Sequence, residues 1–186
     1  MKMKAILPAL AVGSLFGLTS LGAYAADGTI TINGSVTSHT CSIDGNASGA
    51  ANKTITLDPV SAGALAATGQ TAGMSKAADL KFALSGCTGG AKAIATFENG
   101  ATVDQTSGRL LNMASTGAAP NVQVELLNGA FQPINILTNS NNQVATNGAT
   151  ITGGLATLQY YARYYATGTA GPGAVQSTVQ FSMNYL

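Results

Sequence analysis

The chain has 186 residues, of which 46% are hydrophobic and only 8% are charged, with 23 glycines and no tryptophan. This length and composition predict one folded domain and exclude a disordered tail. The formal net charge is +1, and without Lys2 and Lys4 the remaining chain has six basic residues against seven acidic ones. A chain without an excess of basic residues is not a candidate for nucleic-acid binding.

The first 25 residues have the pattern of an export signal. The basic start MKMK precedes an apolar run, AILPALAVGSLFGL, that is shorter than a membrane span. Ala23 and Ala25 then place small residues at the two positions that signal peptidase reads. We expect a signal peptide over residues 1–25, cleaved after Ala25. The alternative is an uncleaved anchor helix, which the shortness of the run and Pro8 disfavour.

The rest of the chain is dominated by short segments with the pattern of β-strands. We expect strands over residues 28–40, 53–57, 78–86, 91–98, 108–113, 121–128, 134–138, 154–167 and 177–186. Four dipeptides that accept positive φ predict tight turns: Asp44-Gly45, Asn99-Gly100, Asn128-Gly129 and Asn147-Gly148. Alanines in residues 60–79 permit a helical turn, but glycines there favour a loop that crosses between sheets. The pattern predicts a single all-β domain, a β-sandwich of immunoglobulin-like kind.

The sequence contains two cysteines, Cys41 and Cys87. In the oxidising compartment that the export signal predicts, an even pair of cysteines favours a disulfide. Such a bond closes a loop of roughly 46 residues and contributes about 4 kcal/mol by constraining the unfolded chain. A metal site is the alternative, but it needs more ligands, and His39 is the only histidine in the sequence. We therefore expect no metal and no cofactor.

Candidate catalytic side chains are few and scattered. A lone histidine does not define a catalytic dyad, and we expect His39 to be a surface or capped residue. The glycine-rich run 168–173 lacks the Lys-Ser/Thr of a phosphate-binding loop and predicts a turn. The carboxylates lie near turns or alternate out of strands, so we expect solvated charges and not a glycosidase pair at Asp58, Asp79, Glu98, Asp104 and Glu125. These patterns predict a protein that is not an enzyme.

Four tyrosines are concentrated in QYYARYYA, residues 159–166. A pleated strand sends Tyr161, Arg163 and Tyr165 to one face, and Tyr160, Ala162 and Tyr164 to the other. We expect a central strand that packs on both faces of its sheet. The alternative is a self-complete secreted sandwich that binds sugar through these tyrosines, although the chain lacks tryptophan, the best stacking residue for sugars.

Both ends of residues 26–186 alternate apolar and polar side chains. One face of the first stretch carries Gly28, Ile30, Ile32, Gly34 and Val36. One face of the last run carries Val179, Phe181, Met183 and Tyr185, and the sequence stops directly after it. We therefore expect the last strand to take its second neighbour from elsewhere. The 15 residues before Cys41 span up to roughly 50 Å when extended, enough to lie along a neighbouring molecule.

These two ends resemble the subunits of chaperone-usher fimbriae, most closely the type 1-like major pilins. In ADGTITINGSVTSHTC the alternating arm has Gly34 seven positions before Cys41, as in the donor arm of that family. In ARYYATGTAGPGAVQSTVQFSMNYL, Gly173 is fourteenth from the end and Tyr185 is the penultimate aromatic residue. The segments LSGC and NVQVELLN also match. Ser177 departs from the pattern, because the alternation there calls for an apolar residue.

The resemblance implies an incomplete immunoglobulin-like β-sandwich that lacks its last strand and is completed in trans by a donor strand. The chain would be divided into a signal peptide (1–25), a donor-strand arm (26–40) and a pilin domain (41–186). The arm would offer Gly28, Ile30, Ile32, Gly34 and Val36. The groove and chaperone-contact strand would be formed by Gly173, Val175, Val179, Phe181, Met183 and Tyr185.

The resemblance also implies a role and partners. The chain would be a shaft-forming fimbrial subunit without enzymatic activity, exported through the periplasm to the cell surface. Its partners would be copies of itself, a periplasmic chaperone, an outer-membrane usher and a tip adhesin. A tip adhesin would itself carry an additional lectin domain. A minor adaptor subunit differs mainly in copy number and stays open as an alternative.

Overall fold

The computed structural model describes residues 41–47 and 51–186, all of which belong to the compact unit Thr37–Leu186. The predicted signal peptide with Ala23 and Ala25, the predicted arm strand over residues 28–40 and His39 lie outside the described residues.

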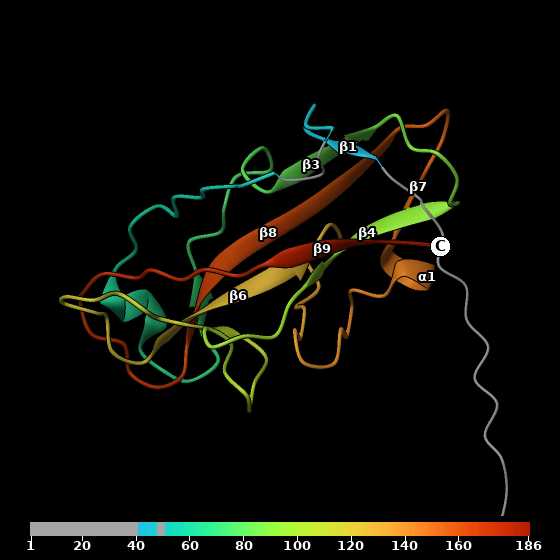
Figure 1. Ribbon diagram of the computed structural model, residues 1–186. Helices are drawn as coiled ribbons and strands as arrows, with labels where there is room; N and C mark the ends of the chain where they lie inside the picture. Colours follow the sequence, from blue (N-terminus) through green and yellow to red (C-terminus); the bar gives the residue numbers. More distant parts are fainter. Residues whose placement is uncertain (1–40, 48–50) are drawn as a thin grey trace, which may run out of the picture. The chain divides into compact units, whose positions relative to one another are not determined.

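The described residues form two antiparallel sheets (Figure 1). The larger sheet has the order β1 (Ser42–Ile43), β3 (Lys81–Ser85), β8 (Ala156–Ala166), β6 (Val122–Asn128) and β5 (Leu110–Leu111), and β2 (Thr71–Ala72) also pairs with β8. The smaller sheet has the order β7 (Ala149–Thr150), β4 (Lys92–Phe97) and β9 (Phe181–Tyr185). Two one-turn helices, η1 (Ala62–Leu65) and α1 (Val144–Asn147), lie in the connections. An all-β fold is thereby confirmed.

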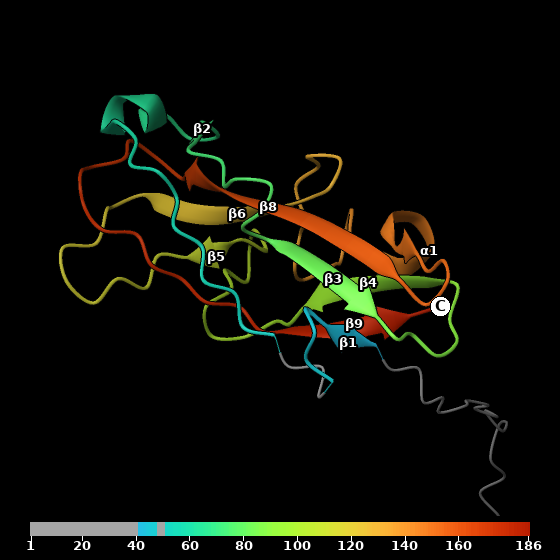
Figure 2. The same cartoon turned by 90° about the horizontal axis from the view of Figure 1, so that it is seen from above.

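The tyrosine-rich strand is the central strand of the larger sheet, as the sequence predicts. β8 pairs with β3 on one side and with β6 on the other (Figure 2). Tyr160 and Ala162 are buried between the sheets, whereas Tyr161 and Arg163 on the other face are partly exposed. The strict alternation of a β-strand thus divides the tyrosines between the core and the outer face.

Aromatic side chains join the two sheets across the core. The ring of Tyr160 lies edge-on to Phe82 and Phe97, at centroid distances of 6.2 and 5.1 Å. Its hydroxyl accepts the N–H of Ala95 in β4 at 3.1 Å and donates to the carbonyl of Ala95 at 3.2 Å. Burial raises the pKa of Tyr160 to about 12, so this hydroxyl stays protonated at neutral pH.

The predicted disulfide between Cys41 and Cys87 is present. Cys41 directly precedes β1 and Cys87 follows β3, and Ser42 pairs with Ser85 in the ladder between these strands. The covalent bond therefore fixes the same two segments that the β1–β3 ladder joins.

Some predicted elements are wrong in extent or kind. Residues 53–57 have the alternating exposure of a strand but belong to no ladder. Residues 134–138 do not form the predicted strand. Residues 136–139 form turns, because the carboxamide oxygen of Asn135 accepts the N–H groups of Leu137 and Thr138 and so competes with strand pairing.

Among the four predicted turn dipeptides, only Asp44-Gly45 has positive φ at both residues, 49° and 84°. Turns also occur at Asn128-Gly129, where the N–H of Phe131 donates to the carbonyl of Asn128, and directly after Asn99, where the N–H of Val103 donates to the carbonyl of Gly100. Residues 60–79 form a loop that contains η1 and β2, but it does not cross between sheets as predicted, because β2 and the following strand β3 both belong to the larger sheet, as does β1 before it.

The prediction that the carboxylates are solvated charges is wrong for Glu125. Its side chain is buried on the outer face of the larger sheet, between two arginines. One carboxylate oxygen accepts Nε of Arg109 at 2.9 Å, and the other accepts Nε and Nη2 of Arg163 at 2.8 and 2.6 Å. Arg109 also lies 3.5 Å from the ring centroid of Tyr165. The ladder places Glu125 directly opposite Arg163, a pairing that strand periodicity alone does not predict.

We expect Glu125→Gln to lower the free energy of unfolding by about 2–4 kcal/mol, because it leaves two guanidinium groups facing each other without their shared counter-charge. Denaturant unfolding measures this loss. Asp58→Asn at an exposed carboxylate is the matched control, for which we expect a change within about 0.5 kcal/mol. Equal stability of the two variants would contradict a stabilising role for the buried carboxylate.

Candidate functional site

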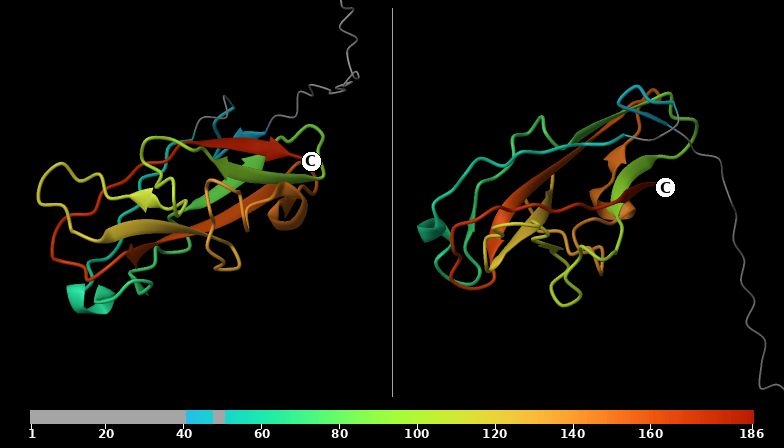
Figure 3. Two further views of the ribbon diagram at one scale, coloured as in Figure 1. Left: turned by 90° about the horizontal axis from the view of Figure 1, so that it is seen from below. Right: turned by 60° about the vertical axis from the view of Figure 1, so that its left-hand side comes forward.

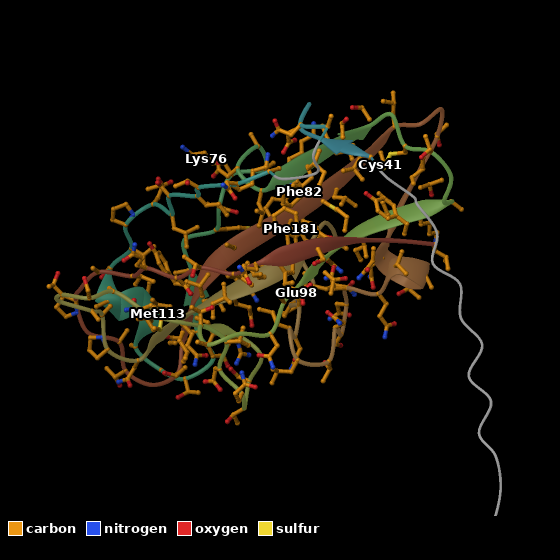
Figure 4. All side chains as sticks on the ribbon, in the orientation of Figure 1. Cys41, Lys76, Phe82, Glu98, Met113 and Phe181 are labelled. Carbon is orange, nitrogen blue, oxygen red and sulfur yellow. A yellow bond between two sulfur atoms is a disulfide. The ribbon has the colours of Figure 1, made fainter. Side chains whose placement is uncertain are left out.

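A groove of about 1310 Å³ runs along β9 and the segment that leads into it. One wall is residues 175–185, and the other is the extended segment 51–57. The floor consists of apolar side chains from both sheets, among them Phe82, Phe97, Leu110, Val124 and Leu126. In Figure 1 the two wall segments, cyan and red, run from the η1 end of the domain toward β1 and β9. Phe82 and Phe181 meet at the groove with ring centroids 4.8 Å apart (Figure 4).

Alternate side chains of the β9 wall face the groove. The intervening residues, from Gln176 to Asn184, are exposed. The inward-facing residues are only partly buried, as expected for a strand whose covered face lacks a layer: Val175, Ser177, Val179, Phe181, Met183 and Tyr185. The opposite wall repeats the pattern, since Lys53, Ile55 and Leu57 are partly buried and their neighbours are exposed.

Among the described residues, the main chain of β9 is hydrogen-bonded along one edge only, the edge beside β4 (Figure 3, left). Lys92 and Leu186 exchange two hydrogen bonds, and the N–H of Glu98 donates to the carbonyl of Gln180. Even-numbered residues of the strand therefore direct their N–H and C=O groups to β4. Because these directions alternate along a strand, Phe181 and its odd-numbered neighbours direct theirs to the opposite edge.

The same alternation continues before β9. The carbonyl of Gln176 accepts the N–H of Met113, and the carbonyl of Thr178 accepts the hydroxyl of Thr102. Ser177 and Val179 therefore direct their main-chain groups away from these partners. In the described part of the chain, no backbone hydrogen bond occupies this edge of the wall. The residues that turn their side chains into the groove thus also present free main-chain groups along it.

The two ends of the groove differ. At one end the Tyr185 side chain reaches the backbone of Cys41, and burial raises the pKa of Tyr185 although this hydrogen bond opposes the shift. At the other end a pocket of about 300 Å³ adjoins the groove and shares Tyr164 and Val175 with it. Gly173 lines this end pocket and not the main groove, and a Cβ at Gly173 would overlap the backbone of residues 117–119.

Charged groups are rare in the groove. The Nζ of Lys53 pairs with Asp44 at 2.7 Å and lies 5.3 Å from the ring centroid of Phe82. Burial would raise the pKa of Asp44, but hydrogen bonds from the Ala83 N–H and from Lys53 hold it below its ordinary value. Within residues 41–47 and 51–186, no group of three or more His, Cys, Asp or Glu residues is arranged to hold a metal ion. Nor is any described helix long and apolar enough to cross a membrane.

The arrangement suits an extended strand better than a small molecule. A strand offers alternate side chains at the spacing of the inward-facing residues and main-chain groups for the open edge. Sequence reasoning placed Val175, Val179, Phe181, Met183 and Tyr185 at the site, and the structure places them along one wall. The sequence did not predict the second wall, residues 51–57. The only sign of it was the alternation in KTITL, residues 53–57. The predicted arm residues lie outside the described chain.

Comparison with known proteins gives consistent matches. The model of the family "Type-1 fimbrial protein, A" (FimA) matches residues 57–186. The major fimbrial subunit SMF-1 of Stenotrophomonas maltophilia is 44% identical over 172 residues, which cover 89% of this chain and 96% of that protein. The F17 fimbrial protein of Escherichia coli is 39% identical over 184 residues, covering 94% and 96%. The crystal structure of a type I fimbria protein of Burkholderia pseudomallei is similar with a TM-score of 0.53 and 28% identity, covering 78% of this chain and 89% of that one.

Proposed function

This chain belongs to the type-1 fimbrial protein family, and from that premise we propose that it is a shaft-forming major subunit that polymerises by donor-strand complementation. As a fimbrial subunit it is exported and assembled into fimbriae on the cell surface. The observation that carries the proposal is the groove, whose inward-facing side chains and free main-chain groups belong to the same residues.

An open groove of this kind is unfavourable for an isolated subunit. It exposes apolar surface such as Val179 and Met183 to water, and it leaves a sheet edge that invites unspecific pairing. One added strand corrects both defects, because its side chains cover the floor and its main chain completes the ladder. The strand that we propose is the arm, residues 26–40, of another copy, with Gly28, Ile30, Ile32, Gly34 and Val36 turned into the groove.

The open groove also implies that other proteins protect the subunit before assembly. We propose that residues 1–25 direct export and are removed, that a periplasmic chaperone covers the groove of residues 41–186, and that an outer-membrane usher exchanges it for the next arm. A tip adhesin would end the fibre. In this role the chain needs no cofactor and performs no catalysis.

Hydrogen exchange of the assembled chain tests the proposal. We expect the main-chain amides of Ser177, Val179 and Phe181 to exchange slowly in the fibre and rapidly in unassembled chain, because the arm closes their edge. The amides of Ser182 and Asn184 are the internal control, since they face β4 in both states. Rapid exchange of the odd-numbered amides within an intact fibre would refute donor-strand pairing.

Phe181→Ser is expected to reduce the periplasmic amount of the subunit several-fold. The variant removes the ring that packs on Phe82 and places a hydroxyl in an apolar wall. Immunoblotting of the chaperone-bound fraction measures the effect. Ser182→Ala, on the exposed face of the same strand, is the control and should leave the amount unchanged. A normal amount of the Phe181→Ser variant in that fraction would count against a groove-wall role.

A further inference from the structure

Phe131 combines an unfavourable backbone conformation with an exposed ring. It lies in the tight turn after β6, where its N–H donates to the carbonyl of Asn128 and the N–H of Asn128 donates to the carbonyl of Gln132. Its φ is 61°. Glycine is the usual residue at the left-handed position of such a turn, and a bulky side chain there is an outlier. The other described non-glycine residues with positive φ are all aspartate or asparagine, which tolerate this conformation.

Packing within the domain accounts for only one face of this ring. Phe131 stacks on Tyr161 of β8, with ring centroids 4.6 Å apart and an interplanar angle of 27°. The residue is nevertheless 53% exposed, so the second face of the ring is open to water. The stabilisation from one stacked pair is of the same order as the strain of a left-handed conformation, so stacking alone gives no net reason for phenylalanine. Strain of this kind clusters at functional sites, and here it points to a use for the open face.

The turn holds the ring in a fixed position. The carboxamide oxygen of Asn128 accepts the N–H groups of Ala130 and Gln132, both at 3.0 Å. The Nδ2 of the same residue donates to Gln132 Oε1 and to the carbonyl of Asn141, again at 3.0 Å. Asn128 itself is buried. A ring that is fixed in advance loses little conformational entropy when a ligand covers it.

Hydrogen-bonding side chains border the open ring. Gln159 and Arg163 flank Tyr161 on the outer face of β8, each about 7 Å away along the strand. Gln132 follows Phe131 directly and is exposed. Arg163 uses Nε and Nη2 in its ion pair, and its Nη1 carries two further N–H donors. The patch therefore combines one apolar ring face with a polar border.

We propose that Phe131 is the stacking platform of a binding site for a neutral pyranose sugar. A pyranose has C–H groups on one face and hydroxyls around its rim, so it covers the open ring while its hydroxyls meet the polar border. The basic groups beside the patch, Arg163 and Lys81, are matched by Glu125 and Asp79. An acidic sugar therefore gains no net electrostatic attraction over a neutral one.

The small apolar surface favours a sugar over a protein partner. A stable protein interface buries about 800 Å² on each side around an apolar core. Here the apolar surface is a single ring face, and the neighbouring Gln132, Gln159 and Arg163 are polar. The site lies on the face of the larger sheet opposite to the groove, so it does not depend on strand exchange. In a fibre of many copies, weak binding at each subunit becomes strong by multivalency.

Saturation-transfer NMR on the chain from residue 26 onward tests the site, with methyl β-galactoside, methyl β-glucoside and methyl α-mannoside as probes. Saturation should reach the ring C–H hydrogens of at least one probe more strongly than its O-methyl group, because the sugar ring stacks. Phe131→Ala should weaken this binding roughly five- to tenfold. Leu155→Ala, at another exposed large apolar residue, is the matched control and should bind as the unmodified chain does. Absence of transfer to all three probes from the unmodified chain would overturn the proposal.

A comparison of stabilities tests whether the ring is kept in spite of strain. Phe131→Gly removes the ring and the strain together, whereas Phe131→Ala removes the ring and keeps the strain. We expect a denaturant midpoint for Phe131→Gly at or above that of the unmodified chain, a lower midpoint for Phe131→Ala, and weakened sugar binding in both. A midpoint for Phe131→Gly as low as that of Phe131→Ala would show that the ring serves the turn itself, and would overturn the inference.

A fibre measurement separates this site from a contact between subunits. Phe131→Ala should assemble into fibres of unchanged stability in SDS. Less stable fibres, together with no sugar binding by the unmodified chain, would overturn the proposal in favour of a subunit contact. A chain that binds the sugar but forms no fibres would instead overturn only the proposed function.

Discussion

A chain that lacks residues 26–38 is expected to lose self-assembly entirely. In the proposed junction Ile30, Ile32 and Val36 each contribute roughly 1.5–3 kcal/mol by burial, about 5–9 kcal/mol together. Each ladder hydrogen bond adds about 0.5–1.5 kcal/mol. SDS gels of unheated and heated samples, with size-exclusion chromatography, measure the result. The chain from residue 26 should give an SDS-resistant ladder that heat collapses, and the truncated chain should stay with a chaperone or aggregate.

A full-length control separates loss of the arm from loss of its apolar face. Ile30→Ser with Ile32→Ser keeps the arm and removes the buried side chains, so it should abolish the ladder as the truncation does. Thr29→Ser with Thr31→Ser, on the opposite face of the arm, should preserve the ladder. Should the truncated and intact chains both run as stable soluble monomers, the groove is closed within one molecule and the sugar-binding alternative gains support.

Local periodicity predicted those features of the fold that depend on a single strand and not on its partners. The alternation around Tyr160 predicted both faces of β8, since the period of a strand divides its side chains whatever its neighbours are. The export signal with Cys41 and Cys87 predicted the disulfide in the same local way. Many short strands joined by tight turns are typical of an all-β sandwich or barrel.

Long-range pairing explains what the sequence did not predict. The β6–β8 ladder places Arg163 opposite Glu125. Arg109, which directly precedes β5 and lies 16 residues before Glu125 in the chain, binds the same carboxylate. Residues 53–57 alternate in exposure like a strand but pair with no described strand. The sequence alone does not show whether a segment has a pairing partner. For the same reason one wall of the groove was predicted and the other, formed by this unpaired segment, was not.

The departure at Ser177 shows how a break in a pattern informs the site. In the sequence it is one polar residue in an apolar alternation, which local reasoning treats as a loosely filled position. Among the described residues, its hydroxyl is buried without a hydrogen-bond partner, and the main-chain groups of the same edge are also unbonded.

Gly34→Val, on the inward-facing side of the arm, is expected to block assembly by steric overlap and not by a loss of contacts. Glycine contributes no buried side chain, so a role based on burial alone predicts that valine strengthens the junction, by about 1.5 kcal/mol or more. If the arm's main chain must approach the wall closely at this point, the added methyl groups displace the strand and the neighbouring ladder bonds are lost with it. The unheated SDS gel should then show no ladder, whereas Ser35→Val, on the opposite face of the arm, should assemble normally. A Gly34→Val chain that polymerises as well as the unmodified one would show that the main chains do not approach closely there, and would remove the reason for a glycine in the arm.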